Sequence, residues 1–259
     1  MVLTAPPEGV NVMKYDYIEC GDCLELMKEI PDESIDMILC DLPYGITRNK
    51  WDCVIPFRDL WDAYNRIAKD NAAIVLFGTG MFTADLMHSN RKMWRYNIIW
   101  EKTQPTGFLN AKRMPLRSHE DILVFYKKLP TYNPQMMHGY PRKVSSAESK
   151  RNCKETTNYG EFKPKSYDST DRYPRSVWKY KTDKQISASH PTQKPIELLK
   201  ALIMTYTNKG DVVLDNCMGS GSTCVACIYT NRHYIGYELS EEYFDIACKR
   251  LDEVEHDLL

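Results

Sequence analysis

Short apolar runs alternate with amphipathic segments through the first half of the chain. Runs of four to six apolar residues predict strands, and apolar positions that recur every three or four residues predict helices. The helical period is clearest around Leu60, Trp61 and Tyr64. The pattern predicts strands at 17–20, 35–40, 72–77, 97–100 and 122–126 and helices at 24–30, 57–68 and 81–88. Strands that alternate with helices favour an α/β fold whose mostly parallel sheet carries helices on both faces.

This alternation stops near residue 127 and resumes near residue 189. The segment between is polar and basic and has no clear period, which is typical of a loop region or an inserted recognition element. Beyond it the pattern predicts helices at 195–206, 222–229 and 241–254 and strands at 212–214 and 233–239. We therefore expect one domain built from residues 1–127 and 189–259, with residues 128–188 inserted as a separate region.

The composition is that of an ordinary globular protein. Of the 259 residues, 43% are hydrophobic and 27% are charged, which suits one large core. No apolar run approaches the roughly 18 residues of a membrane span, and the N-terminus lacks the pattern of a signal peptide. We therefore expect a cytoplasmic protein with its nine cysteines reduced. Two CxxC spacings, at 20–23 and 224–227, fall at a strand end and inside a predicted helix, which favours no metal site.

Charge is unevenly distributed, although the net charge is −1. Residues 142–184 contain 12 Lys and Arg against 6 Asp and Glu, whereas residues 210–259 contain 3 against 10. The basic segment suits a polyanion, although a solvated surface has the same composition. Contacts to phosphates and bases also need aromatic side chains among the basic ones. This segment supplies Tyr159, Phe162, Tyr167, Tyr173, Trp178 and Tyr180.

Candidate chemistry begins with the stretch ILCDLPYG, residues 38–45. A predicted buried strand ends in Asp41, and Leu42, Pro43 and Tyr44 follow it. Proline fixes φ and has no N–H, so Pro43 makes the turn rigid. The stretch therefore presents a small acid and an aromatic ring from a fixed position at the end of a core strand.

A second stretch, VVLDNCMGSGST, spans residues 212–223. A predicted strand ends in Asp215, Gly219 and Gly221 follow in a turn, and the strand after the next helix ends in Glu238. Glycines let backbone approach a ligand, and a helix N-terminus offers free amides. The lysine of a P-loop and the third glycine of a dinucleotide motif are missing. A ligand with a ribose and an ammonium group fits, such as S-adenosylmethionine, and a plain tight turn is the structural alternative.

Together the two stretches resemble the motifs of amino-group DNA methyltransferases. DLPY resembles their catalytic motif, usually Asp-Pro-Pro-Tyr, and DNCMGSGST resembles their cofactor motif, usually Asp-Pro-Phe-x-Gly-x-Gly. HPTQKP at 190–195 matches the segment that precedes the cofactor motif in one subgroup, and GDC at 21–23, WEK at 100–102 and RSHE at 117–120 match as well. The catalytic motif comes first, which is the order of the β group of N6-adenine and N4-cytosine enzymes.

The resemblance implies a Rossmann-like, S-adenosylmethionine-dependent methyltransferase with residues 128–188 as its target-recognition region. It implies methyl transfer to N6 of adenine in a short sequence of double-stranded DNA, after the base is flipped out of the duplex. Asp41 favours adenine, because the N4-cytosine relatives usually carry Ser or Thr there. The resemblance also implies a bacterial or phage-infected cell, in which the enzyme associates with the nucleoid through DNA. A homodimer and a cognate restriction endonuclease are possible partners. The sequence does not predict the recognition sequence or whether the origin is bacterial or phage.

The same resemblance assigns a candidate site. Asp41 and the carbonyl of Leu42 would accept the two N–H groups of the target amine, while Pro43 fixes the turn and Tyr44 stacks on the base. Asp215 would meet the cofactor's ammonium and Glu238 its ribose. The other cofactor candidates are Asp22, Cys23, His190, Thr192, Lys194, Asn216, Gly219, Ser220, Gly221, Ser222, Thr223 and Leu239. A helix N-cap is the structural alternative for the first of these, and a polar loop for residues 190–194.

Two departures from the family pattern stand inside these motifs. Leu42 replaces the usual first proline, and Asn216 with Cys217 replaces Pro-Phe. Neither change removes a group that the chemistry needs. His119 and Glu120 are expected to be a structural pair without a chemical role.

Three other functions fit parts of the sequence. An N4-cytosine methyltransferase shares the motif order, and a non-catalytic DNA-binding relative would share the fold. Asp41, Pro43, Tyr44 and the two glycines are intact, which argues against the non-catalytic relative. RNA and protein methyltransferases fit less well, because in those families the cofactor motif precedes the catalytic one.

Overall fold

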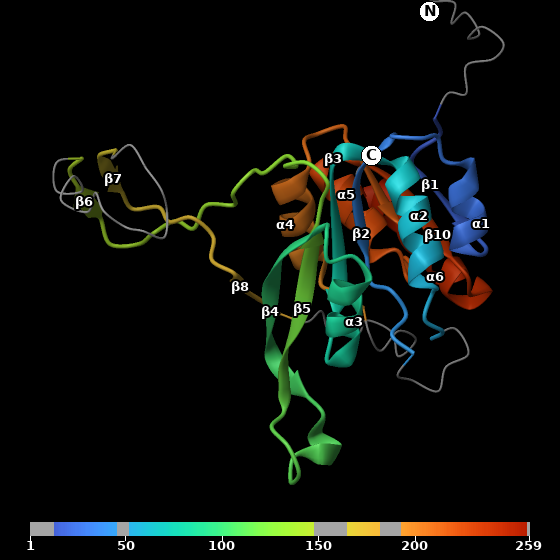
Figure 1. Ribbon diagram of the computed structural model, residues 1–259, viewed down its shortest axis with the longest axis horizontal. Coiled ribbons are helices and arrows are strands. Elements are labelled where there is room, and N and C mark those ends of the chain that lie inside the picture. The colour runs from blue at the N-terminus through green and yellow to red at the C-terminus, as the bar shows by residue number, and fades with distance from the viewer. Residues whose placement is uncertain (1–12, 46–51, 148–164, 182–192, 258–259) are drawn as a thin grey trace, which may run out of the picture. The chain divides into compact units, whose positions relative to one another are not determined.

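The computed structural model describes residues 13–45, 52–147, 165–181 and 193–257 (Figure 1). His190 and Thr192 lie outside these residues. The chain divides into two compact units, a larger one of Met1–Asn133 with Ser176–Leu259 and a smaller one of Pro134–Arg175. Each unit is therefore described by itself.

The larger unit contains the sheet and the helices that cover it. Its helices are α1 (Cys23–Leu26), α2 (Phe57–Ile67), α3 (Met81–Ser89), α4 (Ile196–Tyr206), α5 (Ser222–Thr230) and α6 (Glu241–Asp257), with short 3-10 turns η1 (Met27–Glu29) and η2 (Phe108–Asn110). Its strands are β1 (Tyr17–Cys20), β2 (Ile35–Cys40), β3 (Ala68–Gly78), β4 (Trp94–Thr106), β5 (Arg117–Phe125), β8 (Val177–Tyr180), β9 (Val212–Asp215) and β10 (His233–Glu238).

The sheet order is β1-β10-β9-β2-β3-β5-β4-β8. The five strands from β1 to β3 pair in parallel, and β5 is antiparallel to both of its neighbours. The chain passes from β2 to β3 on one side and from β9 to β10 on the other. The connections at the carboxyl ends of β2 and β9 therefore diverge, and this is where open α/β sheets bind ligands. The predicted mostly parallel α/β fold is confirmed.

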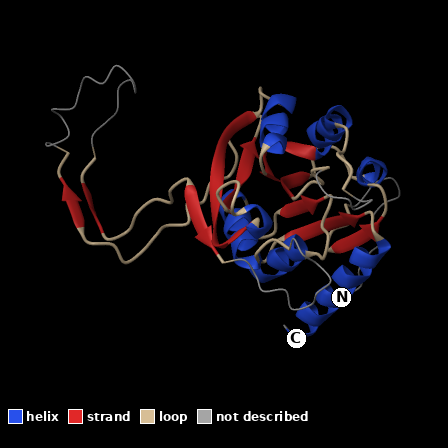
Figure 2. Cartoon of the chain, turned by 90° about the horizontal axis from the view of Figure 1, so that it is seen from below, coloured by secondary structure: helices blue, strands red, loops and turns tan. Residues whose placement is uncertain are grey.

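Alternate residues of β2 point into two cores, one on each face of the sheet. Ile38 and Cys40 belong to the cluster that includes residues of α2 and α3, whereas Met37 and Leu39 belong to the cluster formed with α4, α5 and α6. All four are fully buried or nearly so. Helices lie on both sides of the sheet in Figure 2. The central strand therefore has little freedom to move, and it holds the residue that follows it in place.

The pair β4–β5 forms an antiparallel hairpin longer than predicted. Its buried residues are Ile98, Trp100 and those at 122–125, whereas its outer half is largely polar and exposed. The apolar runs at 97–100 and 122–126 therefore predicted only the part that contains the buried residues. In Figure 1 the hairpin, in green, extends beyond the helices of the larger unit. Strand β8 pairs in parallel with β4, so the region predicted to lack regular structure contributes an edge strand.

The smaller unit contains a two-stranded antiparallel sheet of β6 (Lys143–Ser145) and β7 (Tyr167–Ser169). Arg142 donates two hydrogen bonds to the carboxylate of Asp168, at 2.7 and 2.6 Å. Arg172 donates to the carbonyl of Pro141 at 2.6 Å. Side chains and ion pairs therefore hold a unit with little regular structure. The interpretation of residues 128–188 as a target-recognition region stays a prediction.

Across the described residues, no helix has both the length and the apolar character that crossing a membrane requires. The same residues contain no cluster of three or more His, Cys, Asp or Glu side chains arranged to hold a metal ion.

Candidate active site

Asp41 follows β2 directly and begins the turn that the stretch DLPYG forms. The Tyr44 hydroxyl donates to Asp41 Oδ1 at 2.6 Å. Gly45 closes the turn with a φ of 68°, and its N–H donates to Asp52 Oδ1 at 2.8 Å. A Cβ at Gly45 would lie 2.9 Å from a methyl group of Val54. Glycine is therefore required here both for its backbone conformation and for space.

The Tyr44 ring packs on Phe82 of α3, with ring centroids 4.7 Å apart. Burial raises the pKa of its hydroxyl well above the usual value, and the nearby carboxylates of Asp41 and Glu120 raise it further. The hydroxyl therefore stays protonated and can only donate to Asp41 Oδ1. Leu42, where the family usually has proline, is buried in the core, so packing fixes this position.

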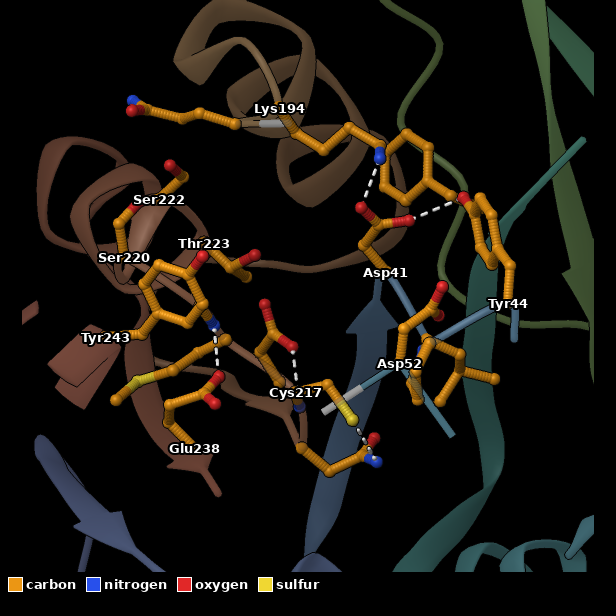
Figure 3. A pocket seen from close by; sticks show the side chains of 18 of the residues that line it. Asp41, Tyr44, Asp52, Lys194, Cys217, Ser220, Ser222, Thr223, Glu238 and Tyr243 are labelled. Carbon is orange, nitrogen blue, oxygen red and sulfur yellow. Dashed lines mark hydrogen bonds and ion pairs between the residues drawn. The ribbon is translucent and has the colours of Figure 1, made fainter. Parts of the chain in front are cut away.

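Lys194 reaches Asp41 from the N-terminal side of α4. Its ammonium donates to Asp41 Oδ2 (Figure 3) and lies 3.5 Å from Glu120 Oε2. Lys102 donates to the other oxygen of Glu120, at 2.5 Å. Two acids and two lysines therefore form one chain of alternating charge, which we call the charge chain: Asp41, Lys194, Glu120 and Lys102.

The charge chain lies in a setting that excludes most water. The side chains of Lys194, Glu120 and Lys102 are 10%, 14% and 9% exposed. Burial lowers the pKa of Lys194, but the adjacent carboxylates outweigh it and raise that pKa. Burial raises the pKa of Glu120, and the two ammonium groups outweigh it and lower that pKa. The buried charges of Lys194 and Glu120 are each stabilised by two oppositely charged neighbours, and removing one neighbour would leave a buried charge with less compensation.

The cofactor stretch lies across the carboxyl ends of β9 and β10. Asp215 Oδ1 accepts the N–H of Cys217 at 3.2 Å. Burial, the largest effect on Asp215, raises the pKa of its carboxyl to about 6, against hydrogen bonds that lower it. Glu238 accepts the N–H of Gly219 on one oxygen at 2.9 Å and that of Ser240 on the other at 2.8 Å. Burial raises the pKa of Glu238 as well.

The glycine turn brings α5 against α6. Gly221 has a φ of 76°, and a Cβ there would lie 3.2 Å from the Cβ of Ala247. Arg250 of α6 donates to the hydroxyls of Ser220 and Ser222 at 3.3 and 2.8 Å. Burial raises the pKa of the Cys40 thiol, at the end of β2, to about 12.

Asp22 and Cys23 stand at the end of β1. Asp22 caps α1, because its carboxylate accepts the N–H of Leu24 at 2.8 Å. Its structural alternative as an N-cap is therefore observed, while its cofactor contact stays a prediction. Asn216 lies 3.5 Å from the Cys23 sulfur and accepts the Tyr64 hydroxyl at 2.5 Å. This buried amide thus ties α2 to the cofactor stretch, at the position where the family usually has proline.

One cavity of about 920 Å³ joins the catalytic turn to the cofactor stretch. Among the described candidates, only Gly221 does not line it. The predicted residues that line the cavity are Asp22, Cys23, Asp41, Leu42, Pro43, Tyr44, Lys194, Asp215, Asn216, Gly219, Ser220, Ser222, Thr223, Glu238 and Leu239. Residues far apart in sequence thus meet at one edge of the sheet.

Sequence reasoning gave no role to several residues that line this cavity. Glu120 was expected only as a structural partner of His119, whereas the structure pairs it with Lys102 and Lys194. Lys102 was recognised only as part of a matching motif, and Asp52 and Tyr243 were not singled out. Lys102 and Glu120 lie on the antiparallel strands β4 and β5, and this placement could have suggested their ion pair. Their meeting with Lys194 could not be foreseen, because it depends on where α4 packs.

The model of a family described as "DNA methylase" (N6_N4_Mtase) matches residues 35–249. The chain belongs to this DNA methylase family. The matched range includes the catalytic turn, the charge chain and the cofactor stretch, so the resemblance drawn from the motifs is confirmed.

Relatives of this DNA methylase agree with the assignment. "DNA adenine methyltransferase YhdJ" of Escherichia coli (strain K12) is 28% identical over 250 residues, which cover 91% of this chain and 82% of that protein. The crystal structure of an M1.HpyAVI–SAM complex is 25% identical with a TM-score of 0.60, and the match covers 90% of this chain and 98% of that one. PvuII DNA methyltransferase, titled cytosine-N4-specific, is 14% identical with a TM-score of 0.64, and the match covers 91% of this chain and 86% of that one. At this identity the likeness shows the fold alone.

The family uses S-adenosylmethionine as its methyl donor, and the residues of this methylase fit that molecule. Each Glu238 oxygen accepts one backbone N–H, which leaves lone pairs for ribose hydroxyls. Asp215 is a buried acid whose pKa is raised by that burial, and the ammonium of the cofactor would supply a compensating positive charge. Ser222 and Thr223, at the N-terminus of α5, line the cavity, and a helix N-terminus offers free amides to a ligand.

Proposed function

We propose that this DNA methyltransferase acts on N6 of adenine in a short sequence of double-stranded DNA. The observation that carries the proposal is Asp41, held at the end of β2 by Tyr44 and Lys194 in the same cavity as the cofactor stretch. Aspartate at this position supports adenine over cytosine, and so does the likeness to an enzyme named for adenine.

The amine of adenine is a poor nucleophile because its lone pair is delocalised into the ring. Asp41 accepts one N–H of that amine and the Leu42 carbonyl accepts the other, which turns the nitrogen toward tetrahedral geometry. A carboxylate has about four acceptor sites, so Asp41 can receive the amine while it keeps Tyr44 and Lys194. The amine nitrogen would bond to the methyl carbon as the carbon–sulfur bond of S-adenosylmethionine breaks and leaves a neutral thioether, and Asp41 is placed to take the N–H proton that leaves.

S-adenosylmethionine, when bound, supplies a methyl group on a positively charged sulfur. Asp215 would hold the ammonium of this molecule and Glu238 its ribose hydroxyls. Gly219, Ser220, Ser222 and Thr223 line the same cavity. Asp22, Cys23, Asn216 and Leu239 line the same end of the cavity.

Lys194 has a role of its own in this proposal, because it donates to Asp41 Oδ2 while Tyr44 donates to Oδ1. With both oxygens held, the carboxylate cannot rotate, and its acceptor direction is fixed before the base arrives. We therefore assign Lys194 to positioning Asp41, whereas the resemblance alone suggested a contact to the cofactor.

The target base must leave the duplex to reach Asp41. The Tyr44 ring offers it a stacking face, and such stacking contributes about 1–3 kcal/mol per base in single-strand binders. The basic and aromatic region 128–188 is proposed to read the sequence. A homodimer and a cognate restriction endonuclease are open features of this proposal.

Sequencing of DNA from cells that express the chain, with detection of modified bases, tests the proposal. We expect N6-methyladenine at one defined short sequence, and nucleoside analysis by mass spectrometry identifies the base independently. Finding only N4-methylcytosine would overturn the assignment to adenine. Labelled cofactor that binds without any transfer to DNA would instead indicate a non-catalytic relative.

A further inference from the structure

The tip of the β4–β5 hairpin carries large apolar side chains in full contact with solvent. Leu109 is fully exposed, Phe108 is 69% exposed and Met114 is 58% exposed. Scattered apolar residues are common on surfaces, but three within seven positions form a patch that marks an interaction site. They lie on a projecting segment (Figure 1), where they contribute nothing to the core.

The backbone of this tip is held by its own hydrogen bonds. Gly107 enters the turn with a φ of 92°, and its carbonyl accepts the N–H of Asn110 at 2.9 Å. Asn110 in turn accepts from the N–H groups of Arg113 and Met114, at 2.8 and 3.0 Å. The turn is therefore a defined structure that presents Phe108 and Leu109 outward without needing a partner to form.

Charge at the tip selects the kind of partner. Residues 103–118 include Lys112, Arg113 and Arg117 and no acidic residue. Two copies of this segment would repel each other, whereas the phosphates of a nucleic acid would attract it. An exposed apolar patch on a segment whose charged residues are all positive fits duplex DNA, which is a polyanion with apolar stacked bases in its interior.

The hairpin also leads from its tip into the cavity. Gln104, Pro105, Thr106 and Arg117 line that cavity together with Asp41, and Thr106 pairs with Arg117 where the hairpin opens toward the tip. DNA that delivers a base to Asp41 therefore has to lie beside this hairpin.

We propose that the hairpin tip enters the duplex next to the target base pair, with Phe108 and Leu109 between base steps and Lys112 and Arg113 on the flanking phosphates. This inference rests on the proposed function, in which the target base leaves the duplex. Proteins that kink or open DNA use apolar side chains of this kind as wedges between steps. The wedge fills the space that the base vacates, so the extruded state persists long enough for methyl transfer.

The test is the double variant Phe108→Ala/Leu109→Ala, measured as single-turnover methyl transfer on two duplexes. Both contain the recognition sequence that sequencing of the wild-type product identifies, one with a paired target base and one with the target base mismatched. A mismatched base costs less to extrude. We expect the paired duplex to react at least about tenfold more slowly, and the mismatched duplex to react within about threefold of the wild-type rate.

A control variant, Met81→Ala/Tyr229→Ala, removes two other exposed apolar side chains that do not line the cavity. It should leave both rates unchanged. Equal slowing of both duplexes by the hairpin variant, or no slowing, would overturn the inference. If light scattering shows a dimer for the wild type and a monomer for the hairpin variant, the hairpin tip binds a second copy of the chain and the inference is overturned. A wild-type chain that methylates no DNA would refute the proposed function and is recognised before any variant is made.

The basic residues provide a second measurement. Lys112→Gln/Arg113→Gln should weaken binding to any duplex and lower the slope of log affinity against log salt by about two. An unchanged slope would show that Lys112 and Arg113 do not contact phosphates and would contradict this part of the inference. Cofactor binding by all variants, followed with the labelled molecule, should match the wild type and verifies that the larger unit is folded.

Discussion

At the scale of single residues, Lys194 separates two interpretations of its motif. The resemblance suggested a contact to the cofactor, whereas the structure places its ammonium on Asp41 and near Glu120. Both roles lie within one cavity, so kinetics must distinguish them.

We expect Lys194→Met to reduce the rate of methyl transfer by about 100-fold and to change the dissociation constant of S-adenosylmethionine by less than about twofold. Asp41→Ala should abolish transfer with the same unchanged cofactor binding. Lys69→Met, which breaks the ion pair with Asp36, is the matched control and should leave the rate unchanged. Loss of cofactor affinity in Lys194→Met would return this lysine to the cofactor.

Asp215 gives the site a dependence on pH. Burial raises the pKa of its carboxyl to about 6, so the negative charge that holds the ammonium is present above that pH and is lost below it. We expect the dissociation constant of S-adenosylmethionine to rise about tenfold between pH 7 and pH 5, measured by calorimetry. Asp215→Asn should bind weakly with little change over the same range. A constant affinity in the wild type would show that Asp215 does not meet the cation.

At the scale of elements, the catalytic turn depends on Gly45. An alanine there requires a left-handed φ and places its Cβ 2.9 Å from Val54, so the turn must shift. The conformation alone costs about 1–2 kcal/mol. We expect Gly45→Ala to lower the free energy of unfolding, measured by chemical denaturation, by more than this and to abolish methyl transfer. Gly210→Ala has a similar φ of 83° with open space around it. Its free energy of unfolding should fall only by the conformational cost, and it should keep full activity. Equal losses of stability and activity in the two variants would contradict the steric argument.

Elements with a buried face could be predicted from the sequence. Strand β2 and helix α4 match their predictions within one residue, because the apolar residues that predict them are the ones buried in the core. The outer half of the β4–β5 hairpin and the edge strand β8 were missed, since pairing through backbone hydrogen bonds leaves little trace in exposed side chains. The meeting of Lys194 with Asp41 was missed for another reason: it follows from tertiary packing, which motifs do not encode.

At the scale of the whole molecule, the order of motifs in the chain matters less than the order of strands in the sheet. Asp41, Asp215 and Glu238 follow or end β2, β9 and β10, which are adjacent and parallel. Their carboxylates therefore meet at one edge although the catalytic motif precedes the cofactor motif. The inserted region can then vary without moving this edge, provided that β8 keeps its place beside β4.

That condition sharpens the test of sequence recognition. Exchanging Pro134–Arg175, the smaller compact unit, for the corresponding segment of a relative with a different target leaves β8 in the sheet, whereas exchanging residues 128–188 replaces it. We expect the first chimera to methylate a different sequence, because side chains that contact base edges determine the sequence that is read. Its cofactor affinity should be unchanged, because the proposed cofactor residues lie outside the exchanged unit. Sequencing of modified DNA measures the outcome. A chimera with wild-type cofactor affinity and wild-type target sequence would place recognition outside this unit, and a second chimera of 128–188 that alone changes the target would assign recognition to the segments around β8.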